Sequence, residues 1–113
     1  MNTLDLLTGG LGPLLTGAQA WSLETTVLAN DIANANTPGF QAETVSFAQA
    51  LDGALTPQVV AAPGLMTANG NGVNLPATLV QLEEAAGRLQ GLDSLIGARL
   101  QALNGVITNL EGA

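Results

Sequence analysis

The side chains that most often perform catalysis are missing from this sequence. It has no histidine, lysine, cysteine or tyrosine, and its only cations are Arg88 and Arg99. General bases and nucleophiles come chiefly from those missing types, and the usual zinc sites and disulfides need cysteine or histidine. We therefore expect no catalytic residues, no metal site and no cofactor.

The remaining candidates for chemistry are carboxylates and amides. Glu83 and Glu84 are adjacent, but neighbouring helical residues do not face each other, which favours a solvated face over an acid–base pair. Residues 69–72, Asn-Gly-Asn-Gly, resemble half a calcium loop but lack its carboxylates. Asp93 interrupts an apolar stripe. It is either a surface residue or the partner of an arginine from another subunit.

The charge of the chain limits its partners. The net charge is −7, so binding to the phosphates of nucleic acid or to an anionic membrane surface is not expected. No apolar run is long enough to cross a bilayer, so no direct membrane insertion is expected. Residues 11–20 end like a signal-peptidase site. However, Asp5 replaces the basic n-region and Pro13 breaks the apolar core, so a cleaved signal is not expected.

The first long element predicted is a helix over about 13–34. Apolar or small residues recur at alternating spacings of three and four, the pattern of a heptad seam that packs on another helix. An ordinary amphipathic core helix explains this pattern equally well when it is taken alone. The large seam residues are Leu14, Trp21, Leu28 and Ile32.

A turn rich in amides ends this helix. Proline and glycine take the second and third positions of Thr37–Phe40, which predicts a type II turn because only the third position needs a positive φ. Asparagine amides before the turn can bond the free carbonyls at the helix end or those of a neighbouring chain. The candidate assembly residues are Asn30, Asn34, Thr37, Pro38, Gly39 and Phe40.

The middle of the chain is expected to be a short helix and a linker. Ser46 and Gln49 fit a capping box, which predicts a helix over about 46–55. Residues 56–74 are rich in proline, glycine and asparagine and predict an extended linker. So long an irregular stretch is uncommon inside a compact domain. A flexible segment, or one lying against another subunit, explains it better.

A second long helix is predicted over about 75–110, with Asn74 as its cap and Pro76 in its first turn. About 35 residues make a rod about 53 Å long, which the rest of the chain cannot cover. Four internal glycines cost about 1 kcal/mol each, so the isolated chain is expected to be soft. Its large seam residues are Leu82, Leu89, Ile96, Leu100, Leu103 and Ile107. The fold expected is all-α: a coiled-coil hairpin of two long helices, within one unit over 1–113.

Two parts of the chain resemble flagellar axial proteins. Residues 29–34 followed by 37–40 are similar to the N-terminal signature shared by flagellar rod and hook proteins. The stretch from Gly70 to Leu110, together with the short length, is similar to the proximal member of the basal-body rod family. Gln41 stands where family members commonly carry a basic residue.

The resemblance implies a non-enzymatic structural subunit of the periplasmic rod of the bacterial flagellum. Such proteins pass the flagellar type III export gate without a cleaved signal and assemble helically into a hollow, torque-transmitting shaft. The implied partners are copies of itself, other rod proteins, and the inner-membrane ring with its rod-adapter protein. The alternative from another class is a soluble coiled-coil adaptor or chaperone of the secretion system, and an enzyme comes a distant third.

Overall fold

The molecule is an elongated pair of helices with a small β-hairpin. The computed structural model describes residues 9–47, 57–62 and 70–112. Its extents are 69 × 29 × 15 Å, and its radius of gyration is 19.0 Å. A compact domain of this length has a radius of gyration of roughly 13 Å. The elements, in chain order, are α2 (Leu11–Ala33), β1 (Glu43–Ser46), β2 (Gln58–Ala61) and α3 (Leu75–Glu111).

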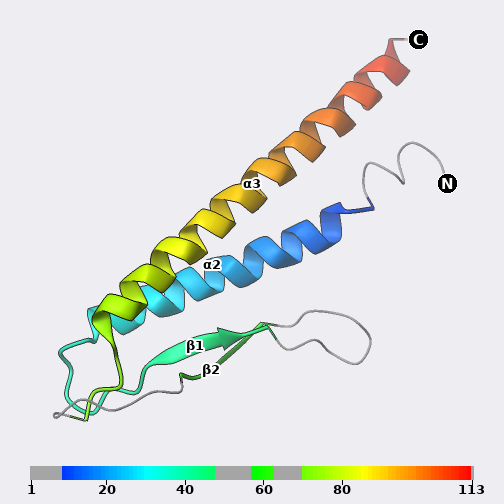
Figure 1. The fold of residues 1–113 in the computed structure, drawn as a ribbon. Coiled ribbons are helices and arrows are strands. Elements are labelled where there is room, and N and C mark those ends of the chain that lie inside the picture. The colour runs from blue at the N-terminus through cyan, green and yellow to red at the C-terminus, as the bar shows by residue number, and fades with distance from the viewer. Residues whose placement is uncertain (1–8, 48–56, 63–69, 113) are drawn as a thin grey trace.

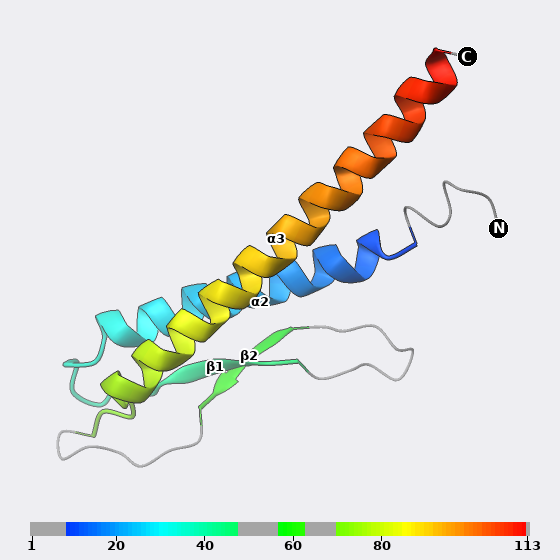
Figure 2. The same ribbon diagram turned by 45° about the horizontal axis from the view of Figure 1, so that its top comes forward.

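The two long helices expected from the sequence are confirmed. They run antiparallel, and α3 extends well past the start of α2 (Figures 1 and 2). Asn74 caps α3 as predicted, because its side chain accepts a hydrogen bond from the Ala77 N–H at 3.1 Å. Helix α2 ends at Ala33, where Asn34 takes a non-helical conformation.

A constant register relates the two helices. Arg88 lies over the Trp21 ring, 5.0 Å from its centroid. Leu92 packs over Gly17, and the Arg99 guanidinium lies over Gly10. The residue numbers of each pair total 109, as expected for antiparallel helices that stay in contact. The first residue of α2 therefore lies opposite the region of α3 just before Leu100.

The burial of the predicted seam changes along α3. Leu82, Leu89 and Ile96 are half-buried where α2 lies beside α3, and Leu103 is also half-buried. A neighbouring row at Thr78, Ala85 and Leu92 is buried or half-buried as well. Leu100 is 49% exposed and Ile107 42% exposed, and both lie beyond the described part of α2. Their place in a seam between subunits therefore stays a prediction.

The middle of the chain is not helical where the structure describes it. Strands β1 and β2 pair antiparallel, with Glu43 opposite Ala61 and Ser46 opposite Gln58. Ser46 is thus a strand residue and not a helix cap, and β2 lies within the predicted linker. The β-branched residues of both strands favour this extended pairing. The remainder of the predicted short helix, residues 48–55, lies outside the described residues.

The buried core is small. Its apolar members are Ala20, Leu28, Ala42, Val45, Val73 and Ala85. In the part of the chain that the structure describes, Leu28 is the only large aliphatic side chain that is fully buried, and it lies on α2. With so little apolar volume enclosed, the fold of one chain depends strongly on that single leucine and on polar contacts.

We expect Leu28→Ala to lower the free energy of unfolding by about 2–4 kcal/mol, because it deletes buried methyl groups and leaves a cavity. Val80→Ala is the control, since Val80 is 63% exposed. Urea unfolding followed by circular dichroism measures both. Equal midpoints for the two variants would show that Leu28 is not the centre of the core.

Candidate functional site: the asparagine clasp

The turn after α2 has the predicted type II conformation. The Phe40 N–H donates to the Thr37 carbonyl at 3.2 Å, and Gly39 has a φ of +76°. Pro38 holds the second position, where its fixed φ suits this turn. No atom lies within 4 Å of where a Gly39 side chain would begin. The need for glycine is therefore conformational and does not come from crowding.

Asn34 links the end of α2 to this turn. Its side-chain Nδ2 donates to the Asn30 carbonyl at 2.9 Å, which satisfies one of the free acceptors at the helix end. Its Oδ1 accepts from the Thr37 hydroxyl at 3.1 Å. The sequence predicted that asparagine amides would bond these carbonyls, and Asn34 does so. The Asn30 side chain is exposed and lies 3.4 Å from the Asn34 amide.

A second asparagine, Asn71, closes the site from the other half of the chain. It is 0% exposed, and its Nδ2 donates to the carbonyls of Asn34 at 2.7 Å and Thr37 at 2.6 Å. Its Oδ1 accepts from the Val73 N–H at 2.8 Å. The Asn71 side chain thus binds two carbonyl groups at the end of α2 and the start of the turn, and one N–H group of its own segment. We call Asn34, Thr37 and Asn71 the asparagine clasp.

Backbone contacts continue the clasp. The Gly72 N–H donates to the Phe40 carbonyl at 2.9 Å. Gly70 has a φ of +78°, and a side chain there would begin 3.6 Å from the Gly39 Cα. The two segments therefore lie against each other at the two glycines that have a left-handed conformation. From the sequence, the segment around Asn71 resembled half a calcium loop, yet its amide binds the protein's own carbonyls.

Two acids of α2 hold the β-hairpin in place. Both Asp31 carboxylate oxygens accept from the Glu43 N–H, at 3.0 and 3.2 Å. The Glu24 carboxylate accepts from the Val45 N–H at 2.9 Å and from the Thr44 hydroxyl at 3.3 Å. The acids are seven residues apart, on one face of α2. They satisfy alternate N–H groups of β1 on its edge away from β2.

The burial of Asp31 at this contact shifts its pKa. Desolvation raises the pKa of Asp31 above its ordinary 3.8, although the hydrogen bond from the Glu43 backbone acts in the opposite direction. The negative charges of Glu43 and Glu24 add to the rise. Sequence reasoning gave neither Asp31 nor Glu24 a partner. The available signal was two acids one heptad apart on a helix face that is otherwise apolar.

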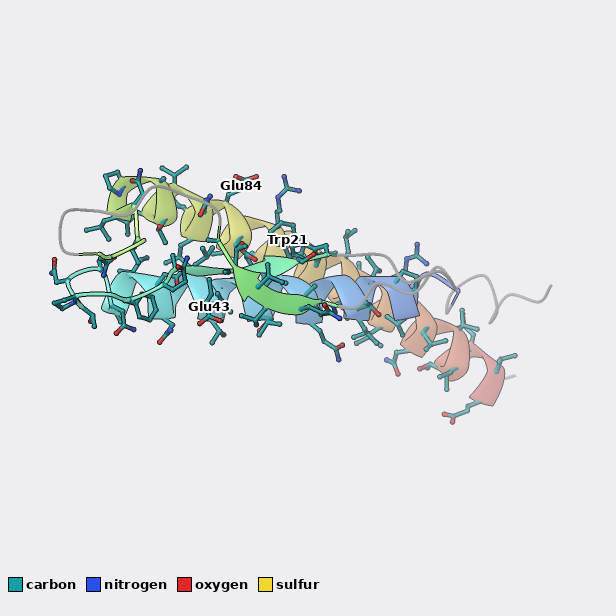
Figure 3. All side chains as sticks on the ribbon, turned by 90° about the horizontal axis from the view of Figure 1, so that it is seen from below. Trp21, Glu43 and Glu84 are labelled. Atoms are coloured by element: carbon teal, nitrogen blue, oxygen red, sulfur yellow. The ribbon has the colours of Figure 1, made fainter. Side chains whose placement is uncertain are left out.

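An aromatic contact joins α2 to the residue that follows β1. The rings of Trp21 and Phe47 are 4.9 Å apart between centroids, and Arg88 stacks on Trp21. Arg88 also pairs with Glu84 at 3.0 Å, and both side chains of that pair are more than half exposed. Figure 3 shows Trp21 and Glu84 on this part of the molecule. The exposed ion pair between Arg88 and Glu84 adds little stability. The contribution of this cluster therefore comes mainly from the packing of Trp21 against Phe47 and Arg88.

The arrangement is suited to holding segments together. In the part of the chain that the structure describes, every buried side-chain nitrogen or oxygen has a hydrogen-bond partner. No group of three potential metal ligands gathers among these same residues. The polar side chains of the site are occupied by backbone groups of the protein itself.

Comparison with known families finds a match for the segment that holds Asn34 and Thr37, two of the three clasp residues. Residues 14–41 match the family model described as flagella basal body rod protein. The match supports a place in the flagellar basal-body rod family. It covers most of α2 and the whole type II turn, which is 28 of the 113 residues. The rod family is a structural family. No curated protein matches the chain.

We expect Asn71→Asp to lower the free energy of unfolding by about 3 kcal/mol, because it removes two donors and buries a charge facing two carbonyls. Asn104→Asp makes the same chemical change at an exposed position of α3 and should have little effect. Urea unfolding of the two variants gives the comparison. A similarly small effect at both positions would contradict the clasp.

The raised pKa of Asp31 predicts a pH dependence with a definite sign. Because the folded state holds the Asp31 proton more tightly than the unfolded state, this group favours folding more as pH falls through its folded pKa toward 3.8. The stability of the wild type relative to Asp31→Asn should therefore rise between pH 7 and pH values near 4. A relative stability that falls on acidification would mean that burial does not dominate at Asp31.

Proposed function

We propose that this protein is a structural subunit of the proximal rod of the bacterial flagellum, of the FlgB type. It builds part of the hollow shaft that transmits torque from the inner-membrane ring to the hook. It leaves the cytoplasm through the flagellar export gate without a cleaved signal. It contacts copies of itself, other rod proteins and the rod-adapter protein of the ring.

The observation that carries the proposal is that the clasp joins two separate family-like segments. The family model matches residues 14–41, which end just beyond the type II turn. Asn71 binds that turn and lies in the segment that resembles the proximal rod member.

The architecture suits a subunit that is completed by its neighbours. The core of one chain is small, and several large apolar side chains of α3 are exposed. Burying such side chains between subunits provides a hydrophobic driving force for assembly. None of the described helices is both long enough and apolar enough to cross a membrane. The small core and the exposed apolar side chains favour a building block completed by its neighbours over a self-sufficient coiled-coil adaptor or chaperone.

A deletion strain tests the proposed role. Cells lacking this chain should be non-motile, and electron microscopy should show inner-membrane rings without rods. A plasmid copy should restore both rods and swimming. Assembled rods in the deletion strain, combined with reduced secretion of other axial proteins, would favour the adaptor or chaperone instead.

The type II turn gives a sharper prediction. Gly39→Val should abolish or strongly impair swimming, because a β-branched residue resists the φ of +76° at this position. Gly39→Asn is the matched control, since asparagine adopts positive φ far more readily. The plasmid complementation assay, with secreted and cellular levels measured by immunoblot, separates assembly from expression. Normal swimming with valine would show that the turn geometry is dispensable.

A further inference from the structure

The last three turns of α3 project beyond the described part of α2. The register of the helix pair places the start of α2 opposite Arg99, so residues 100–111 continue for about 18 Å without α2 beside them. We call residues 99–111 the overhang. Leu100 is 49% exposed, Ile107 42% and Leu110 65%. In water, a row of exposed leucine and isoleucine is typical of an interaction surface.

The overhang differs in charge from the rest of the molecule. Arg99 is the only charged residue between Asp93 and Glu111, whereas the rest of the chain holds eight of the nine acids and one other arginine. Arg99 forms no ion pair with another described residue. Arg88, by contrast, is paired with Glu84. The overhang therefore begins with the one cation that the described structure leaves unpaired.

A groove of matching character lies farther along the helix pair. It is a shallow groove open to solvent between α2 and α3, with a volume of about 640 Å³, and its lining residues are Leu15, Ala18, Gln19, Ser22, Leu23, Thr26, Leu89, Asp93 and Ile96. Asp93 is its only charged residue, and it has no ion-pair partner among the described residues. Along α2 the groove runs from Leu15 to Thr26, about 17 Å of helix, close to the length of the overhang.

We propose that the overhang of one copy binds in this groove of a second copy, with Arg99 of one chain paired to Asp93 of the other. The inference rests on the proposed rod function and names the surfaces through which copies meet. A second copy is the partner favoured by charge, because each chain carries one unpaired cation on an apolar ridge and one unpaired anion in an apolar groove. Acidic surfaces elsewhere on the chain would repel each other.

The two surfaces are different, which has a consequence for assembly. A contact between unlike surfaces is heterologous, so each bound copy still offers a free overhang or a free groove. Repetition of the contact extends the assembly in one direction. The same contact also covers Leu100, Ile107 and Leu110, the residues that fall outside the helix pair of one chain.

Charge exchange in the purified full-length chain tests the contact. Analytical ultracentrifugation would compare the wild type with Asp93→Arg, Arg99→Asp and the double variant, with circular dichroism as the check on folding. Each single reversal should weaken self-association at least about tenfold, because it sets like charges against each other. The double variant, and an equimolar mixture of the two single variants, should recover association to within about threefold of the wild type. Glu83→Arg changes the charge by the same amount as Asp93→Arg outside the groove and should not weaken association.

The outcomes separate this contact from the proposed function. A wild type that stays monomeric to about 1 mM, or a double variant that stays as weak as the single variants, overturns the contact. If that happens while the chain is still found in basal bodies, the rod function survives and only the docking surface is wrong. Recovery of association by the double variant, in a chain absent from basal bodies, would keep the contact and reject the rod.

Discussion

The fold depends on how the carbonyl groups after α2 are satisfied. A helix end and a tight turn both leave acceptors unpaired, and burying them without donors costs free energy. The Asn34 and Thr37 carbonyls each accept one backbone N–H, and Asn71 supplies a second hydrogen bond to both from a segment more than thirty residues later in the chain. Because Asn74 caps α3 three residues after Asn71, the same contact sets where the second helix begins.

Polar contacts carry an unusual share of the stability of this molecule. Glu24 and Asp31 attach the hairpin through backbone N–H groups, and few large apolar side chains are fully enclosed. Hydrogen bonds of this kind contribute modestly but are costly to break when buried. They define one arrangement of the elements without providing much total stability. Such a balance suits a chain that stays well defined in shape and gains its remaining stability by association.

The sequence predicted the elements with strong local signals and missed those that depend on distant partners. Asn74 and Pro76 mark the start of α3, and Pro38 with Gly39 specifies the turn, because each acts on its own neighbours. The hairpin was missed because Ser46 also fits a helix cap, and only its pairing with Gln58 decides for a strand. Leu100 and Ile107 are exposed in one chain because they lie beyond the described part of α2, and periodicity alone does not reveal where the partner helix begins.

The same reasoning applies to the clasp. Asn71 carries no local signal of burial, and the glycines on either side of it are equally typical of an exposed loop. Its role emerges only when the Asn34 and Thr37 carbonyls are brought to it. The central claim, that this clasped helix pair is a rod subunit, is tested most directly by mass spectrometry of purified basal bodies stripped of hook and filament. The account predicts that the chain is retained with the inner-membrane ring and the other rod proteins. Its absence there, together with abundance in the cytosol, would contradict the account.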